Sequence, residues 1–164
     1  MMCLMKELEQ FIVPYLISQA VAIGFLFAAG KSTRLARLLF SVLFVAASAL
    51  NMYLGLTSPN SYLVYAKMAV PLYRNIINGW FCHYNQFIIP VIAFGQFAIG
   101  VGMLLKGWWL KLACLGTIIF LLSIAPLMTG SAFPFSLILS WAAWLVLKKG
   151  KNDYLWQSIR PTLS

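Results

Sequence analysis

Long apolar runs with almost no charge fill most of this chain, and they decide which folds are open to it. Hydrophobic residues make up 62% of the 164 residues and charged residues only 9%. A chain of this size cannot hide so much apolar surface inside a water-soluble core, so its solvent must be lipid. The runs lack the alternation of a membrane barrel, and helices satisfy their own backbone hydrogen bonds in lipid. We therefore predict an all-α, polytopic membrane helix bundle.

Five of these runs are predicted to cross the membrane, which makes the whole chain, 1–164, a single membrane domain. The first four are close to the roughly 20 residues that cross about 30 Å of hydrocarbon as helix. The fifth is short but has Trp and Lys residues at its ends. An amphipathic segment at about 61–82, interrupted by Pro71, is predicted to lie at the interface or to fold back over the bundle. The predicted spans are about 11–29, 35–56, 87–105, 108–127 and 132–147.

Basic residues cluster at the ends of these runs and predict an orientation. If the connections after the first and third runs and the segment after the fifth are cytoplasmic, nine of the twelve Lys and Arg residues lie inside. Only Lys6, Lys67 and Arg74 then lie outside. The positive-inside rule predicts an inner-membrane protein with its N-terminus out and its C-terminus in. The net charge of +9 does not indicate nucleic acid, because the charges follow the span ends, and the predicted partner is the lipid bilayer.

Acidic residues are nearly absent, which limits the chemistry that we expect. Glu7, Glu9 and Asp153 are the three acids of the chain, and all lie outside the apolar runs. Carboxylates inside a membrane are the usual means of moving protons and binding metal ions. The cysteines form no CxxC pair and no zinc spacing, although a Cys3–Cys82 disulfide is one alternative. We therefore predict a neutral bundle interior, no metal site and no catalytic residues.

Gln96 is the most suggestive polar residue, because an amide in mid-span is costly unless it is hydrogen-bonded. One interpretation is an interhelical hydrogen bond at a crossing lined by Gly95, Gly100 and Gly102, and the other is contact with a ligand. Asn51 has three interpretations: the partner of Gln96, part of a polar pocket beneath the outer segment, or a C-terminal helix cap. Together with four residues of the outer segment, these two form the predicted pocket for a ligand or a partner. Its residues are Asn51, Tyr73, Arg74, Trp80, His83 and Gln96.

Arg74 and His83 are the charged and titratable members of that pocket. A guanidinium at position 74 could bind a lipid phosphate, a quinone carbonyl or a partner's carboxylate, or it could snorkel to the headgroups. His83 is the single histidine of the chain and has no carboxylate nearby, so it is a weak metal or catalytic candidate. These two residues alone predict no reaction.

Three stretches resemble the DoxX-like family of small bacterial membrane proteins, which includes the small subunit of thiosulfate:quinone oxidoreductase. They are RLLFSVLFVAASALNMYLG from Arg37, PLYRNIINGWFCHYNQF, and VIAFGQFAIGVGMLLKGWWLKLACLG. The resemblance covers roughly 37–147 and implies a four-helix unit, to which the first run adds an extra N-terminal span. It also implies a role beside a quinone-linked redox process, with a membrane redox protein as partner and a quinone as the cofactor. Gln96 stands where relatives often carry an acid, so a charge-dependent role does not transfer.

Three functions are compatible with these features. The first is an accessory or partner-binding subunit of a quinone-linked redox process, without an activity of its own. The second is a small lipid or solute transporter with a polar path lined by Ser18, Gln19, Asn51 and Gln96. The third is a membrane enzyme that acts on quinone or lipid through Cys82 and His83.

Overall fold

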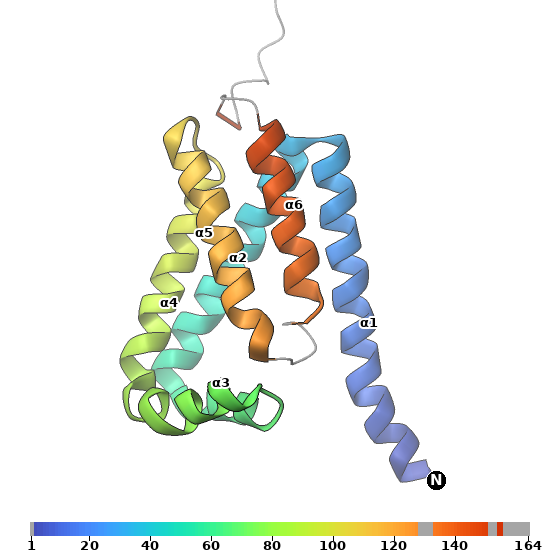
Figure 1. Cartoon of the computed structure of the whole chain (residues 1–164), viewed down its shortest axis with the longest axis vertical. Helices are drawn as coiled ribbons and strands as arrows, with labels where there is room; N and C mark the ends of the chain where they lie inside the picture. Colours follow the sequence, from blue (N-terminus) through green and yellow to red (C-terminus); the bar gives the residue numbers. More distant parts are fainter. Residues whose placement is uncertain (1, 128–132, 151–153, 156–164) are drawn as a thin grey trace, which may run out of the picture.

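The computed structural model describes residues 2–127, 133–150 and 154–155, and it describes side chains from Tyr15 onward (Figure 1). Over these ranges the chain is all-helical and has no β-strand. Three helices are long and apolar enough to cross a membrane, namely Thr33–Thr57, Pro71–Gly102 and Trp108–Leu127. The chain therefore has the long apolar helices that a membrane protein needs, and two further helices run beside these three.

The helices alternate in direction along the bundle. Helix α1 ends and α2 begins at one end, and the connection between α4 and α5 returns to that same end (Figure 1). Helix α6 also ends there, so the first and last helices of the described chain point toward the same end. The elements are α1 (Met2–Lys31), α2 (Thr33–Thr57), the 3-10 helix η1 (Pro59–Lys67), α3 (Pro71–Ile76), the π-helix η2 (Ile77–Phe81), α4 (Cys82–Gly102), α5 (Trp108–Ile124), the 3-10 helix η3 (Ala125–Leu127) and α6 (Phe135–Lys149).

Helix α2 is central and α1 is peripheral. In Figure 1, α2 (cyan) crosses behind α5, with α4 on one side of the bundle and α1 on the other. Helix α2 packs against α4, α1 and α6, whereas α1 packs against α6 and α2. The segments η1 and α3 close the end opposite the α1–α2 turn (Figure 1). We call this the capped end, and the opposite end the basic end.

Local residue chemistry sets the helix boundaries. Ser32 separates α1 from α2 and caps α2, because its Oγ accepts a hydrogen bond from the Leu35 N–H. Pro71 occupies the first turn of α3, where proline needs no amide hydrogen. From Pro71 the helix continues through the π-turn η2 to Gly102 without a break. The second half of the predicted interfacial segment and the predicted third span are therefore parts of one long helix that starts at Pro71, whereas the first half of that segment lies in η1 and the turn after it.

Apolar side chains from α1, α2, α5 and α6 form the main core. The rings of Phe25 and Phe40 meet edge to face at 4.9 Å between centroids, which joins α1 to α2. Phe44 and Phe120 make the same contact at 5.7 Å between α2 and α5. A smaller cluster around Ala69 fills the space under the cap. There the Val70 N–H donates to the Pro126 carbonyl, so the cap is bonded to the end of α5.

The basic end carries most of the charge. Among the described side chains, seven basic residues belong to the helix ends and connections at this end. They are Lys31, Arg34, Arg37, Lys106, Lys111, Lys148 and Lys149. Lys67 and Arg74 lie at the capped end. Asp153, Lys151 and Arg160 lie outside the described residues, as do the side chains of Cys3, Lys6, Glu7 and Glu9.

Candidate functional site

A chain of neutral hydrogen bonds joins α2, α4 and the cap. The amide Nδ2 of Asn51 donates to Oε1 of Gln96 at 2.6 Å, and the hydroxyl of Tyr62 donates to Oδ1 of Asn51 at 2.5 Å. Gln96 is buried and Asn51 is half-buried. The interhelical hydrogen bond, which was one of the two interpretations of Gln96, is present. Asn51 is not a helix cap, because α2 continues to Thr57 and its C-cap is Ser58.

Glycines allow α2 and α4 to approach closely around this hydrogen bond. A Cβ atom at Gly100 would lie 2.8 Å from a methyl carbon of Val45 and 3.2 Å from the Ser41 carbonyl oxygen. A Cβ at Gly55 would lie 2.8 Å from a methyl carbon of Ile89. The hydroxyl of Ser48 crosses the same interface and donates to the Ala93 carbonyl at 2.7 Å. Small residues and side-chain hydrogen bonds are the usual way in which helices associate in lipid.

The glycines that line this crossing of α2 and α4 differ from the three that were predicted. A Cβ atom at Gly95 would meet no atom within 4 Å, so this glycine faces away from α2. Gly102 lies against a different helix, because its Cβ would be 2.8 Å from the Cβ of Ala113 in α5. Of the three predicted glycines, only Gly100 lines the α2–α4 crossing, and Gly55 of α2 provides a second close contact.

Tyr62 and a neighbouring pair of amides connect this hydrogen-bond chain to the cap. Burial raises the pKa of the Tyr62 phenol above its ordinary value, and the nearby Tyr65 adds to the shift. The neutral hydroxyl that donates to Asn51 is therefore the favoured form. Beside it, Nδ2 of the buried Asn85 donates to Oδ1 of Asn60 at 2.9 Å, which links α4 to η1. None of these groups is a base or a nucleophile at neutral pH, so the arrangement holds helices together and offers no acid–base step.

Arg74 and Tyr73 bond to backbone carbonyls at the capped end. The guanidinium of Arg74 donates through Nε to the Ala66 carbonyl at 3.1 Å and through Nη2 to the Ala69 carbonyl at 3.4 Å. The hydroxyl of Tyr73 donates to the Ser123 carbonyl at 2.9 Å. Arg74 therefore fastens η1 to α3, and Tyr73 fastens α3 to α5. Their role in the structure is to brace the cap.

Trp80 and His83 lie on exposed faces and do not approach Gln96. The ring of Trp80 packs against Tyr84, with centroids 5.8 Å apart. His83 is exposed, and its Nδ1 lies 2.8 Å from the Gly79 carbonyl of the preceding turn. Two cavities are found elsewhere, and none of the six predicted residues lines either of them. Of the predicted pocket, only Asn51 and Gln96 contact each other; the ligand role itself stays a prediction.

The described part of the chain holds no group of three or more His, Cys, Asp or Glu side chains that could bind a metal ion. Cys82 and Cys114 are free thiols, on α4 and in the interior of α5. The predicted Cys3–Cys82 alternative cannot be followed, because the Cys3 side chain is outside the described residues. The described ranges also contain no carboxylate side chain beside His83 or Arg74.

Sequence reasoning counted Arg37 only as a topology signal, but it is a buried structural residue. Its side chain is 2% exposed. Nε donates to the Met103 carbonyl at 2.9 Å and an Nη to the Leu105 carbonyl at 2.7 Å. These carbonyls follow the C-terminal end of α4, where the helix dipole is negative. The sequence feature that indicates this buried role is the position of Arg37 inside the apolar run 35–56, because a guanidinium in such a run needs a hydrogen-bond partner.

The helices also expose two long stripes of large side chains. The first, the α4 stripe, follows a spacing of four and three residues, and each member is at least 51% exposed. It consists of Trp80, Tyr84, Phe87, Val91 and Phe94. The second, the α5 stripe, has the same spacing but mostly aliphatic members. It consists of Trp108, Leu112, Leu115, Ile119 and Leu122.

Comparison with known proteins gives no relative for this chain. No protein-family model, no curated protein and no solved structure matches it.

Proposed function

We propose that this protein is an integral membrane subunit without an activity of its own, which binds a partner protein in the inner membrane. All five long helices span the bilayer in this proposal, with the basic end in the cytoplasm and the capped end outside. The charge distribution supports that orientation, since seven described basic side chains gather at one end. The N-terminus is then outside and the C-terminus inside.

The α4 stripe is the observation that carries the partner-binding proposal. Aliphatic side chains suffice to face lipid, as they do in the α5 stripe. The α4 stripe instead places Phe87 and Phe94 in the middle of a long apolar helix, 74% and 70% exposed. Aromatic residues are enriched where one protein surface packs on another. Their spacing of three and four residues places them on one face of the helix, as in the α5 stripe, so the aromatic content is what distinguishes the α4 stripe.

The nature of the partner follows from the resemblance to the DoxX-like family. That resemblance supports a membrane redox protein as partner and a quinone-linked process as the setting. The internal hydrogen bonds support an accessory role, because Asn51 and Gln96 bond to each other and Arg74 bonds to backbone carbonyls. A quinone would then be the cofactor of the assembly.

Photo-crosslinking in native membranes tests this proposal. The photoreactive residue p-benzoylphenylalanine replaces Phe94 in one variant and, in the other, Ile119, the most exposed aliphatic residue of the α5 stripe. We expect Phe94 to yield one discrete crosslinked polypeptide, identified by mass spectrometry as a redox protein, and Ile119 to yield lipid adducts only. If both positions give lipid adducts only, the partner-binding role is wrong. A crosslinked partner without redox function would refute only the quinone-linked part.

The transporter is our second candidate, and one observation favours it. Oε1 of Gln19 in α1 is buried without a hydrogen-bond partner among the described residues. However, the four residues of the predicted path are divided: Ser18 and Gln19 belong to α1, while Asn51 and Gln96 join α2 to α4 on the other side of the bundle (Figure 1). Flux through proteoliposomes that is abolished by Gln96→Leu, in protein that stays folded, would favour transport.

A membrane enzyme has less support than the partner-binding subunit or the transporter, because His83 is exposed and bonds only to its own helix. Cys82 precedes His83 in the chain, and the described residues place no carboxylate beside them. Loss of a quinone- or lipid-dependent activity in the double variant Cys82→Ser, His83→Ala would revive this candidate.

A further inference from the structure

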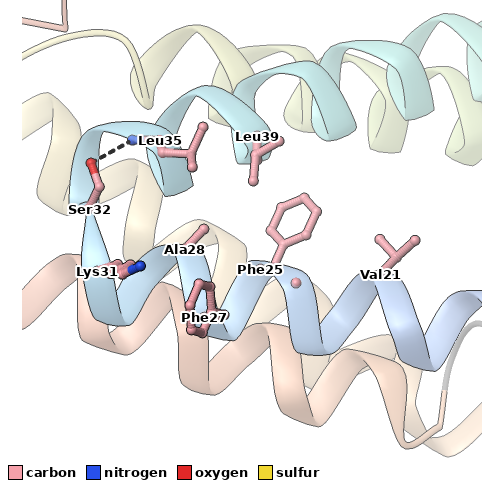
Figure 2. A pocket seen from close by; sticks show the side chains of 9 residues that line it. Val21, Phe25, Phe27, Ala28, Lys31, Ser32, Leu35 and Leu39 are labelled. Atoms are coloured by element: carbon pink, nitrogen blue, oxygen red, sulfur yellow. Dashed lines mark hydrogen bonds between the residues drawn. The ribbon is translucent and has the colours of Figure 1, made fainter.

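An apolar groove runs between α1 and α2 at the basic end of the bundle. It has a volume of about 440 Å³ and is lined by residues of both helices and of the turn between them. Figure 2 shows Phe25 of α1 and Leu39 of α2 pointing toward each other across it, with Val21 further along α1. Phe25 is 6% exposed, whereas Val21 and Leu35 are 43% and 49% exposed. The groove therefore has a buried floor and an open side that faces lipid.

A positive charge stands at the end of the groove where the two helices meet. Lys31 lines the groove and its Nζ lies 5.1 Å from the centroid of the Phe27 ring. The positive end of the α2 dipole and the negative end of the α1 dipole both lie at this turn and offset each other, so the basic side chains supply its net charge. Arg34 adds a second positive side chain in the first turn of α2. No acidic side chain among the described residues offsets these charges.

We propose that this groove is a binding site for one anionic phospholipid. An acyl chain lies between Val21, Phe25 and Leu39, and the phosphate lies at the turn within reach of Lys31. The groove matches such a lipid in shape and in charge, because the apolar channel runs parallel to the helices and ends at the cationic turn. A soluble anion would not fill the apolar channel, and a zwitterionic lipid would bring a second cation beside the lysine together with its phosphate.

A second cavity at the same end has a different character and serves as an internal comparison. It lies between the start of α5 and the end of α6, has a volume of about 480 Å³, and is lined by Lys111 and Lys148. Its lining also includes apolar residues of α5 and α6, but two of these, Leu110 and Val146, are buried. With two lysines against the single lysine of the groove, this cavity is the one expected to attract phosphate mainly by charge.

Two glycines of α1 allow the acyl-chain contact to be tested without disturbing the packing. A Cβ atom at Gly24 or at Gly30 would meet no atom within 4 Å, but only Gly24 lines the groove. Gly24→Leu should fill the channel, and Gly30→Leu is the matched control. Native mass spectrometry of the full chain in micelles doped with phosphatidylglycerol should show one retained lipid on the wild type. Excluding about two methylene groups should weaken retention about tenfold in Gly24→Leu and leave Gly30→Leu unchanged.

The charge contact is tested with Lys31→Gln, and Lys111→Gln is the control from the second cavity. The probes are phosphatidylglycerol, phosphatidylcholine with the same acyl chains, and inorganic phosphate. Wild-type protein should prefer phosphatidylglycerol about fivefold, and Lys31→Gln should abolish that preference while Lys31→Arg and Lys111→Gln retain it. Wild-type retention in Gly24→Leu would overturn the proposal. So would an equal loss in Lys31→Gln and Lys111→Gln, or competition by inorganic phosphate alone, which would indicate a free-phosphate site.

Discussion

Helix α2 contacts its two long neighbours, α4 and α1, in different ways. Against α4 it uses close backbone approach at Gly100, side-chain hydrogen bonds such as Asn51 to Gln96, and a buried arginine. Against α1 it uses the Phe25–Phe40 contact and leaves the groove described above. In lipid, apolar contact alone gives little preference for protein over solvent, so polar bonds and close packing decide which pair is firm. The α2–α4 pair is the firm one, and α1 is docked more loosely.

The largest effect should come from Arg37→Met, which removes the donor for two carbonyls. The buried Met103 carbonyl and the half-buried Leu105 carbonyl would both lose charge-assisted hydrogen bonds. We expect the free energy of unfolding in micelles to fall by about 3 kcal/mol. Lys111→Met, at an exposed position of the same end, should change it by less than about 0.5 kcal/mol. Equal effects in the two variants would mean that the arginine bonds do not hold the α2–α4 pair.

Gly100→Leu should separate the same two helices. A Cβ there would already lie 2.8 Å from a Val45 methyl carbon and 3.2 Å from the Ser41 carbonyl oxygen, and the backbone oxygen cannot rotate away. Overpacking of this kind should cost about 2 kcal/mol in a chemical unfolding titration. Gly95→Leu is the matched control from the same helix, because its Cβ would meet nothing within 4 Å. A control as unstable as Gly100→Leu would show that the close crossing is not the cause.

The hydrogen bond between Asn51 and Gln96 should contribute less. Single Asn51→Leu and Gln96→Leu variants and the double variant form a double-mutant cycle, with unfolding free energies measured in one detergent. We expect a coupling energy of about 1 kcal/mol, as for side-chain hydrogen bonds between other membrane helices. Strictly additive losses would mean that the two amides do not stabilise each other.

High pH should weaken the link from Asn51 to the cap. The folded-state pKa of Tyr62 is raised, chiefly by burial and also by Tyr65. Its contribution to stability is thus fully present below the unfolded value of about 10 and is lost as the pH rises through the folded value. Between about pH 8 and 11, the free energy of unfolding should fall more steeply for wild type than for Tyr62→Phe. Parallel curves would contradict this assignment.

The smallest effect on stability should come from Gly24→Leu at the α1–α2 pair. The new side chain enters open space, and leucine has a better helix propensity than glycine by somewhat less than about 1 kcal/mol. We therefore expect no loss, and at most a slight gain, in the thermal midpoint in lipid-free micelles. A loss comparable to that of Gly100→Leu would show that α1 is packed as tightly as α4.

The sequence was informative where a single physical rule decided the outcome. Apolar run length predicted the all-helical membrane chain, and the cost of an amide in lipid correctly made an interhelical hydrogen bond one interpretation of Gln96. It failed where two rules compete at one residue. Pro71 does divide the outer segment as predicted, since η1 ends at Lys67 and α3 begins at Pro71, but the sequence did not show that the helix beginning there continues into α4. Arg37 was assigned to the membrane surface, because burial of a guanidinium depends on carbonyls far along the chain.

The grouping of the six candidate residues was the least predictable part. Tyr73 and Trp80 are seven residues apart and would share one face of a regular α-helix, whereas Arg74 would lie on another. The π-turn η2 begins between Tyr73 and Trp80 and changes that register. Tyr73 and Arg74 brace the cap, and Trp80 is exposed. Sequence spacing alone does not say which faces of α3 and η2 turn toward α2. For that reason the predicted pocket and the observed hydrogen-bond chain share only Asn51 and Gln96.

The arginine at position 37 also constrains the order in which the protein is assembled. Its acceptors, Met103 and Leu105, come 66 and 68 residues later in the chain. Both acceptors are therefore made after the rest of α4, so these two hydrogen bonds can form only once the ribosome has added the start of the α4–α5 turn. Helix α2 thus completes its contacts late in synthesis, through a segment that follows its main partner helix.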